Sequence, residues 1–268
     1  MEELEEIKNP SSEADSIDVD RIKATDIITK NPYVLLIDGV GKMSKGNISA
    51  WSGIAKSKKT FALTLAMANM VARKSLHEKF SPVVTNKVAW IDTEQSPYDA
   101  QKVVKRIKVM AGLEDNLMFY GLRKYGAKVR VAKIENLLKT QGNNIDVLVI
   151  DGVRDLVLDF NDATESSEII TKLMAWTIDY DCHISVVLHA NKGDGFMRGH
   201  LGSELQNKAE TVFKVTKDEQ LKDVSLIEET FGRGRNVDPF KISINNDGLP
   251  EVVDNDLISV DEIGAAPY

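Results

Sequence analysis

The sequence predicts a three-layer α/β fold, in which a mostly parallel, twisted sheet is covered by helices on both faces. Strand-like and helix-like segments alternate through most of the chain, as they do in successive βαβ units. Two segments, Val147–Ile150 and Ile184–Leu188, are nearly continuous aliphatic runs, which is typical of central parallel strands. After residue 209, short strand-like runs follow one another without helices. The sheet is therefore expected to end in antiparallel hairpins.

Hydrophobic periodicity and turn residues set the expected bounds of each element. A strand entering a turn is expected at Tyr33–Gly39. The alternating part has strands at Asn47–Trp51, Lys87–Asp92, Leu117–Tyr120, Asp146–Asp151 and His183–His189. The helices that separate them are expected at Lys59–Ser75, Pro97–Ala111, Val129–Gln141 and Ser166–Asp179. The antiparallel strands are expected at Thr211–Thr216, Val224–Thr230, Phe240–Asn245 and Glu251–Val253.

Composition indicates one main domain that follows a tail. The chain has 268 residues, of which 43% are hydrophobic and 28% charged, as in globular proteins with a full core. Residues 1–20 carry eight acidic groups and almost no apolar side chains, which is typical of a solvated tail. A short helix is expected over Val19–Lys30. We therefore divide the chain into an acidic N-terminal tail and linker, 1–30, and one α/β domain, 31–268.

Hydropathy, cysteine content and charge narrow the functional classes. No stretch approaches the roughly 18 to 20 apolar residues that span a bilayer, and the acidic start is unlike a signal peptide. We expect a cytoplasmic protein with no membrane partner. The only cysteine, Cys182, cannot form an internal disulfide and is interpreted as a buried structural thiol. The net charge of −7 argues against coating DNA with the whole surface, but allows a local basic channel.

A turn rich in lysine lies between the strand Asn47–Trp51 and the helix after it. It fits the pattern G-x-x-x-x-G-K-[ST] at Gly53, Lys59 and Thr60. In that pattern backbone amides hold phosphates, the lysine bridges the outer ones, and the hydroxyl binds magnesium. The alternative is a chance basic turn that caps a helix. The predicted nucleotide-binding residues are Gly53, Ala55, Lys56, Ser57, Lys58, Lys59, Thr60 and Phe61.

Lys58 stands where this pattern has its second glycine. That glycine normally allows a close approach of the backbone to the phosphates. Lys58 could adopt the same backbone conformation at some cost, or its amine could add a contact to phosphate. Because of this difference, the sequence matches the pattern only at the fixed positions Gly53, Lys59 and Thr60.

Polar residues close three of the later strands. Glu94 follows the strand Lys87–Asp92, Asp151 ends an aliphatic strand, and His189 ends the next one. Nucleotides bind at the carboxyl ends of strands in open α/β sheets, so these residues should face the turn at Gly53–Thr60. There Glu94 can activate the attacking water, Asp151 can hold the magnesium shell and His189 can reach a γ-phosphate. Taken singly, each residue is also common at the end of a strand without any such role.

The order of these motifs resembles the RecA-like ATPases, and most closely the plasmid RepA-type hexameric helicases. The resemblance covers the phosphate loop, Asp92-Thr93-Glu94, the strand ending at Asp151, and Leu188-His189-Ala190-Asn191. It extends over roughly Ile48 to Asn245. The string Phe231-Gly232-Arg233-Gly234-Arg235-Asn236 is similar to the Lys-x-Arg-Asn finger of replicative ring helicases, which projects into the neighbouring subunit's nucleotide site.

This resemblance implies a role for each matching residue. Lys59 and Thr60 would hold phosphate and magnesium, Glu94 would be the base, Asp151 the magnesium-shell carboxylate and His189 the γ-phosphate sensor. Arg233 and Arg235 would act on a neighbour, since planar guanidinium groups match phosphate oxygens. The alternative is that both arginines lie in a solvated glycine-rich hairpin. The implied cofactors are ATP and Mg²⁺, and the implied assembly is a homo-oligomer, a hexameric ring.

In ring ATPases of this class, DNA passes loops after the fourth and fifth strands of the sheet. The corresponding segments here are Arg154–Ser166, which is acidic, and Ala190–Gly202. The second contains Lys192, Arg198 and His200 around Phe196 and Met197, a composition that suits single-stranded DNA through phosphate attraction and stacking. The family's Arg-Gly-Ser is Leu201-Gly202-Ser203 here, with Arg198 three positions earlier. A second basic run, Arg123–Arg130, is interpreted as a solvated helix entrance.

Three functional hypotheses follow. The first is an ATP-hydrolysing RecA-like motor that acts as an oligomeric DNA helicase, or as a replication or mobilisation ATPase, of a mobile element. The second is a RecA-like recombination or DNA-repair ATPase, which would form filaments without directional unwinding. The third is a non-catalytic nucleotide-binding regulator, in which Lys58 marks a loop that binds nucleotide without turnover.

Overall fold

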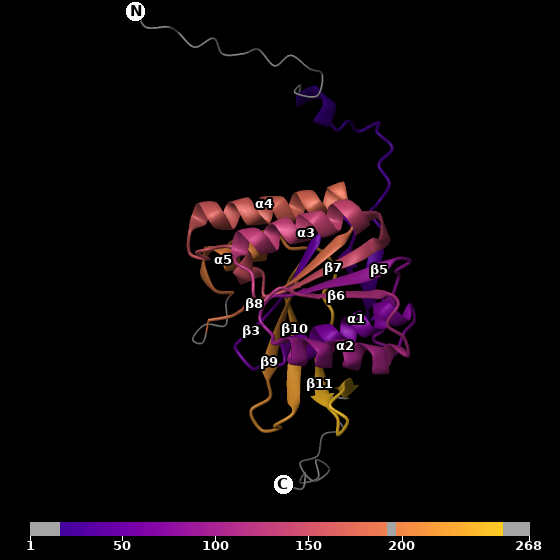
Figure 1. Cartoon of the computed structure of the whole chain (residues 1–268). Coiled ribbons are helices and arrows are strands. Elements are labelled where there is room, and N and C mark those ends of the chain that lie inside the picture. The colour runs from indigo at the N-terminus through magenta and orange to yellow at the C-terminus, as the bar shows by residue number, and fades with distance from the viewer. Residues whose placement is uncertain (1–16, 192–196, 254–268) are drawn as a thin grey trace, which may run out of the picture. The chain divides into compact units, whose positions relative to one another are not determined.

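The computed structural model describes residues 17–191 and 197–253 of the chain, which is drawn in Figure 1. The chain divides into two units, Met1–Lys30 and Asn31–Tyr268. In the first unit a single 3₁₀ turn spans Ile17–Asp20, and residues 21–30 form no helix. The helix predicted over Val19–Lys30 is therefore wrong. Residues 20–30 are all exposed, and a short segment rich in isoleucine and threonine does not form a helix without a packed face.

The main element of the second unit is a nine-stranded sheet with the order β12-β11-β10-β9-β3-β8-β7-β5-β6. Its parallel strands are β3 (Ile48–Gly53), β5 (Lys87–Asp92), β6 (Leu117–Gly121), β7 (Ile145–Asp151), β8 (His183–His189) and β9 (Thr211–Lys217). The antiparallel strands are β10 (Val224–Gly232), β11 (Phe240–Ile244) and β12 (Pro250–Val253). The predicted mixed sheet with antiparallel C-terminal strands is confirmed.

Helices cover both faces of this sheet, so the predicted three layers are confirmed (Figure 1). On one face lie α1 (Lys59–Ala72) and α2 (Pro97–Ala111), and on the other lie α3 (Ala127–Gln141), α4 (Ala163–Asp179) and α5 (Gly199–Lys208). Short 3₁₀ turns at Gly142–Asn144 and Val153–Leu156 precede and follow β7. Helix α4 begins three residues before the predicted start, because the Asp162 side chain accepts from the Glu165 backbone N–H and caps it.

Two features were not predicted. The strand expected at Tyr33–Gly39 is β1 (Tyr33–Ile37), and it belongs to a separate antiparallel sheet with β2 (Val40–Ser44) and β4 (Phe80–Pro82). Helix α5 occupies the end of the segment Ala190–Gly202, which was expected to be a loop. Its sequence begins with two glycines in four residues and has no capping side chain, so the usual signals of a helix start are missing.

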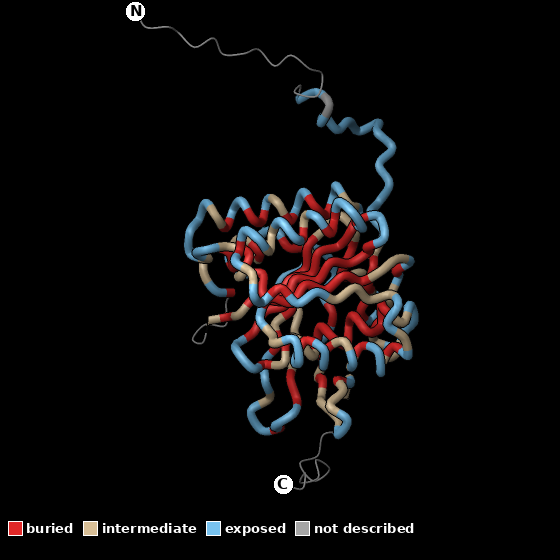
Figure 2. Tube along the Cα trace, viewed as in Figure 1, coloured by how far each residue is buried: buried red, intermediate tan, exposed pale blue. Residues whose placement is uncertain are grey.

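The core consists of two hydrophobic clusters, one on each face of the main sheet, which Figure 2 shows as buried strands between exposed helix surfaces. The cluster under α1 and α2 includes Trp51 and Phe213, whose ring centroids are 4.6 Å apart on neighbouring strands. It also takes in side chains of the small sheet, such as Phe80. Burial on both faces fixes the register of the parallel strands, and with it the level at which each one ends.

One buried polar residue within this core, His183, has both ring nitrogens in short contacts. The His183 imidazole is fully buried, and its two nitrogens lie 2.8 Å from the Ser44 carbonyl oxygen and 2.9 Å from the Ser49 hydroxyl. Burial lowers the pKa of His183 to about 4, which keeps the ring neutral. Cys182 is buried, and burial raises the pKa of its thiol to about 12, as expected for a structural thiol. No helix in the described part of the chain is long and apolar enough to cross a membrane.

Candidate nucleotide-binding site

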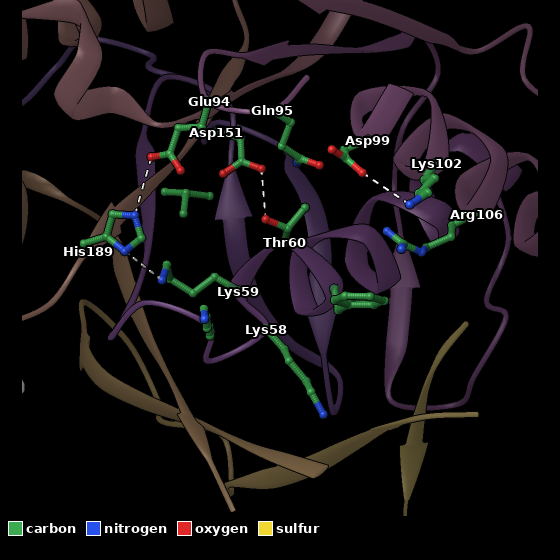
Figure 3. Close-up of a pocket in the computed structure, with 13 residues that line it drawn as sticks. Lys58, Lys59, Thr60, Glu94, Gln95, Asp99, Lys102, Arg106, Asp151 and His189 are labelled. Carbon is green, nitrogen blue, oxygen red and sulfur yellow. Dashed lines mark hydrogen bonds and ion pairs between the residues drawn. The ribbon is translucent and has the colours of Figure 1, made fainter. Parts of the chain in front are cut away.

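Four adjacent strands of the sheet end at one level and carry the candidate residues. Gly53 at the end of β3 is paired in register with His189 at the end of β8. Asp151 at the end of β7 is paired with Asp92 at the end of β5. Glu94 follows two residues later and points to the same place, as Figure 3 shows. The residues predicted at strand ends are therefore brought together, because parallel strands in register end on the same edge.

The turn between β3 and α1 wraps the amine of Lys59. Its Nζ donates to the carbonyl oxygens of Gly53 and Ile54, each at 2.9 Å, and lies 3.2 Å from Nδ1 of His189. Burial lowers the pKa of Lys59, while Glu94 and Asp151 counteract that effect. The lysine is thus held at the first turn of α1, at the helix end that attracts anions.

His189 connects Lys59 to Glu94 (Figure 3). An ammonium group can only donate, so Nδ1 of His189 accepts from Lys59 and the ring proton resides on Nε2. Nε2 lies 3.5 Å from Oε1 of Glu94. The hydrogen bond from His189 lowers the pKa of Glu94 against the opposing effect of burial. Glu94 is therefore an ionised carboxylate that can accept a proton.

Thr60 and Asp151 form the second half of the cluster. The Thr60 hydroxyl donates to Oδ2 of Asp151 at 3.1 Å. Burial, together with the nearby charges of Asp92 and Glu94, raises the pKa of Asp151 to about 7. Burial also raises the pKa of Asp92, whose Oδ1 accepts from the backbone N–H groups of Glu94 and Gln95. The carboxyl groups of Asp92 and Asp151 are thus buried at neighbouring strand ends, and the exposed carboxylate of Glu94 lies near them.

A pocket of about 530 Å³ opens beside this cluster, a size that suits a small organic ligand. Lys56, Lys58, Lys59, Thr60 and Phe61 of the predicted loop line it, together with Glu94, Asp151 and His189. Gly53, Ala55 and Ser57 shape the turn but do not line the pocket. At its far end the Arg106 guanidinium lies 4.2 Å from the centre of the Phe61 ring, which makes a flat face suited to stacking.

A family model described as an AAA domain matches residues 10–195, which is more than half of the chain. The chain belongs to this family of P-loop ATPase domains. No curated protein matches the chain. The predicted resemblance to P-loop ATPases of the RecA-like class is thereby confirmed, and the chain is a nucleotide-binding domain.

The residues of this P-loop domain fit a magnesium ion. Oδ2 of Asp92 is buried and has no hydrogen-bond partner among the described residues, and burial, with the charges of Asp92 and Glu94, raises the pKa of its strand neighbour Asp151. Mg²⁺ prefers oxygen ligands and retains several waters, so it needs few protein groups. Thr60 and Asp151 are the residues that would hold it, and Asp92 would face its water shell. No cluster of three or more metal-binding side chains occurs within 17–191 and 197–253.

Lys58 lines the pocket of the P-loop domain, but its amine does not contact the carboxylates there. Its backbone is left-handed, with φ 67° and ψ 29°, the conformation that the missing glycine would adopt without cost. Its Nζ donates to Oδ1 of Asp223 at 3.1 Å and to the Lys222 carbonyl oxygen at 3.2 Å. Figure 3 shows this side chain pointing away from Thr60 and Asp151. Of the two outcomes considered for Lys58, the structure has the conformational cost without a contact to the carboxylate cluster.

Sequence reasoning missed the residues that hold Glu94 in place. The Thr93 hydroxyl lies 2.9 Å from Oδ2 of Asp155. The Thr93 carbonyl oxygen accepts a hydrogen bond from the Arg130 guanidinium at 3.2 Å. Arg130 also donates to the Asp155 carbonyl oxygen, so the interpretation of Arg123–Arg130 as a solvated helix entrance is wrong for this residue. Gly152 has φ 102°, and a Cβ there would lie 2.1 Å from the Thr93 hydroxyl. The sequence signal that was available is the pair of strand-end aspartates, Asp92 and Asp151.

Arg233 and Arg235 lie at the opposite edge of the sheet from the phosphate loop. Strand β10 ends with Gly232 paired to Thr211, and Thr211 pairs with Ser49 at the start of β3. Both arginines are exposed. They therefore do not join the cluster in their own subunit.

The structure describes two of the three predicted DNA-binding residues, Arg198 and His200. Lys192 lies outside the described residues. Arg198 and His200 are exposed, while Met197 is buried. The Arg198 guanidinium lies 5.3 Å from the centre of the Phe160 ring, and that of Arg154 lies 4.7 Å from it. The segments after β7 and β8 thus meet at a half-buried phenylalanine flanked by two arginines.

The Lys58 backbone gives a testable prediction on stability. Lys58→Gly removes the cost of the left-handed conformation, whereas Lys58→Ala keeps it, and both lose the Asp223 ion pair. In denaturant unfolding we expect Lys58→Gly to be more stable than Lys58→Ala by about 1 kcal/mol. Equal stabilities would contradict the strain. Nucleotide affinity, measured by calorimetry on the same variants, should stay near wild type, and a tenfold loss in Lys58→Gly would show that the amine contacts nucleotide.

The crowded carboxylates give a second prediction. Because the folded-state pKa of Asp151 is raised from 3.8 to about 7, the wild type loses stability as the pH rises between these values. At about pH 7.5 and without nucleotide or magnesium, Asp151→Asn should be more stable by up to about 4 kcal/mol. The gap should close toward pH 4. Urea unfolding across this range measures it, with Asp162→Asn at the cap of α4 as the control. A less stable Asp151→Asn at neutral pH would refute the argument.

Proposed function

We propose that this P-loop domain hydrolyses ATP with Mg²⁺ and works as an oligomeric motor on single-stranded DNA. The observation that carries the proposal is the alignment of four strand ends, which brings Lys59, Thr60, Glu94, Asp151 and His189 to one pocket. These side chains match, position by position, the parts that phosphoryl transfer requires. Catalysis of this kind depends on positioning and charge stabilisation more than on covalent chemistry.

The proposed reaction assigns one task to each residue. Lys59 and the amides at the start of α1 hold the phosphates, and Thr60 and Asp151 hold Mg²⁺, which neutralises charge on the outer phosphates. Glu94 takes a proton from the water that attacks the γ-phosphorus, while the bond from that phosphorus to the leaving ADP breaks. His189, which contacts both Lys59 and Glu94, is positioned to sense whether the γ-phosphate is present.

The assembly that we propose is a homo-oligomeric ring. Arg233 and Arg235 lie at the edge of the sheet opposite their own phosphate loop, which supports assigning them to a neighbour's site rather than their own. Heterologous interfaces that close on themselves form rings. The resemblance to RepA-type hexameric helicases favours six subunits and a role in replication or mobilisation of a mobile element.

The segments after β7 and β8 support single-stranded DNA as the partner. Phe160 offers a ring for base stacking, and Arg154 and Arg198 beside it offer positive charge for phosphates. Arg198 also donates its backbone N–H to the His189 carbonyl oxygen at 3.2 Å. Strand β8 therefore connects this DNA candidate to the proposed γ-phosphate sensor.

The central test is ATP turnover with and without single-stranded DNA, measured beside the oligomeric mass. Glu94→Gln should lower turnover at least about 100-fold while nucleotide still binds, because only the base is lost. Lys59→Ala should lose both binding and turnover. Glu114→Gln, an exposed change far from the pocket, is the control. Turnover that is absent in wild type, or unaffected by Lys59→Ala, would exclude the motor.

The DNA candidate has its own test. Phe160→Ala should weaken single-stranded DNA binding about tenfold or more, in line with about 1–3 kcal/mol for one stacked base. Fluorescence anisotropy with a labelled oligonucleotide measures the affinity, and Met174→Ala on the exposed face of α4 is the control. Unchanged affinity in Phe160→Ala would exclude this surface. Filaments on DNA without directional unwinding would instead favour the recombination hypothesis.

A further inference from the structure

The turn that carries Arg233 and Arg235 is held at both ends by strand β2 of the small sheet. This turn, residues 232–236, joins β10 to the chain that leads into β11. Its residues are exposed, so packing does not fix their conformation. The contacts to β2 are therefore what sets the direction in which the two arginines project.

The first contact is a buried ion pair. Lys42 and Glu229 are each 1% exposed, and Nζ of Lys42 lies 2.8 Å from Oε1 and 2.7 Å from Oε2 of Glu229. The same Nζ donates to the Arg235 carbonyl oxygen. Oε2 of Glu229 accepts from the Val237 backbone N–H at 3.0 Å. The pair thus holds the backbone on both sides of Asn236.

The second contact anchors the other end of the turn. Both carboxylate oxygens of Glu210 accept from Ser44, one from its N–H at 2.9 Å and one from its hydroxyl at 2.8 Å. The Glu210 carbonyl oxygen accepts from the Arg233 backbone N–H at 3.0 Å. Lys42 and Ser44 are two positions apart on β2 and so lie on the same face of the strand. Lys42 fixes the turn at Arg235, and Ser44 fixes it at Arg233 through Glu210.

The arginines themselves differ in what they contact. The Arg233 guanidinium donates to the Lys208 carbonyl oxygen at 3.2 Å, within its own subunit. Among the residues that the structure describes, the Arg235 guanidinium has no hydrogen-bond or ion-pair partner. The turn also leaves no room for a side chain at Gly232, where a Cβ would lie 1.8 Å from Oε1 of Glu229. Arg235 is therefore the side chain that the turn presents outward.

A buried ion pair is seldom kept for stability alone. Taking two charges out of water costs about as much as their attraction returns, and apolar replacements of similar size are often neutral or stabilising. What Lys42 and Glu229 provide, and apolar side chains cannot, is a donor for the Arg235 carbonyl oxygen and an acceptor for the Val237 N–H. Their distinctive contribution is geometric.

We propose that Lys42 and Glu229 are positioning residues that aim Arg235 into the nucleotide site of the neighbouring subunit. This rests on the proposed trans role of the arginines. Neither Lys42 nor Glu229 lines its own nucleotide pocket, and both contact the backbone of the turn, so the pair is expected to affect hydrolysis in the adjacent site. Loss of the ion pair leaves the subunit's own nucleotide binding intact and lowers ATP turnover in the neighbouring subunit's site.

The test uses the double variant Lys42→Met/Glu229→Met, which removes both charges together and keeps the volume. Asp38→Asn is the matched control, because it breaks the Lys79 ion pair of the same small sheet without touching the turn. Trypsin should cut after Arg235 at least about tenfold faster in the double variant, because an anchored loop resists cleavage. Nucleotide affinity and thermal stability should stay near those of wild type.

A mixing experiment then distinguishes an effect on the subunit's own site from an effect on the neighbouring subunit's site. Alone, the double variant should turn over ATP at the level of Arg235→Ala, at least about tenfold below wild type. Mixed in equal amounts with Lys59→Ala, which is inactive but has an intact turn, it should recover. With random assembly, about a quarter of the interfaces would combine the intact phosphate loop of a double-variant subunit with the intact arginine turn of a Lys59→Ala subunit. Arg235→Ala should recover in the same mixture.

Each other outcome counts against the proposal. Wild-type turnover or an unchanged trypsin rate in the double variant would overturn the role of Lys42 and Glu229 while leaving Arg235 intact. The role of Lys42 and Glu229 would also be overturned if mixing with Lys59→Ala restored the turnover of Arg235→Ala but not that of the double variant. Normal turnover in Arg235→Ala, or a monomer in the presence of nucleotide, would remove the trans role itself and the positioning proposal with it.

Discussion

The register of four parallel strands is the constraint on which the site depends. Gly53 aligns with His189, and Asp92 with Asp151, because both faces of these strands are buried and a slip of one residue would move every side chain into the core cluster on the opposite face. The core thus determines which polar residues meet at the strand ends. Helix α1 starts at that same edge, so its positive end and the carboxylates are brought together by the packing of residues that take no part in the chemistry.

The cluster formed in this way is costly in free energy. The carboxyl groups of Asp92 and Asp151 are buried near the charge of Glu94, Oδ2 of Asp92 lacks a hydrogen bond within the described residues, and Lys58 has a backbone conformation that suits glycine. Sites that bind charged ligands commonly hold such strain, because surrounding structure keeps it in place. Here Lys222 and Asp223, between β9 and β10, and the hydrogen bonds of Arg130 with Asp155 and Thr93 supply that support. The P-loop domain is therefore best understood as a stable frame around a locally unfavourable arrangement.

The sequence was sufficient for the parts of the structure that follow from local pattern. Strands β5 and β8 and helix α2 have the predicted bounds, because continuous aliphatic runs and a Pro-initiated amphipathic segment are unambiguous. Glu94, Asp151 and His189 could be selected by their place at strand ends.

What could not be predicted depends on contacts between distant segments. Lys42 lies in a strand with no clear alternation and is paired with Glu229, 187 positions away. In the sequence Arg130 is part of a basic run that predicts a solvated surface, whereas in the structure its guanidinium donates to the Thr93 carbonyl oxygen. Helix α5 and the small sheet lacked caps or periodicity that would mark them. In each case a side chain finds its partner only after the sheet has formed.

The two core clusters also differ in how much of the chain they require. The cluster under α3, α4 and α5 draws on residues from Ile48 to Val212, whereas the one under α1 needs Phe240 and Ile242 from near the end of the described chain. During synthesis the first can close before the last strands leave the ribosome, but the helix that begins at the phosphate loop stays partly uncovered until β11 emerges. The segment that matches the family model, 10–195, stops short of those strands. The hydrophobic cover of the helix that begins at the phosphate loop therefore includes strands that lie outside the family-matched segment.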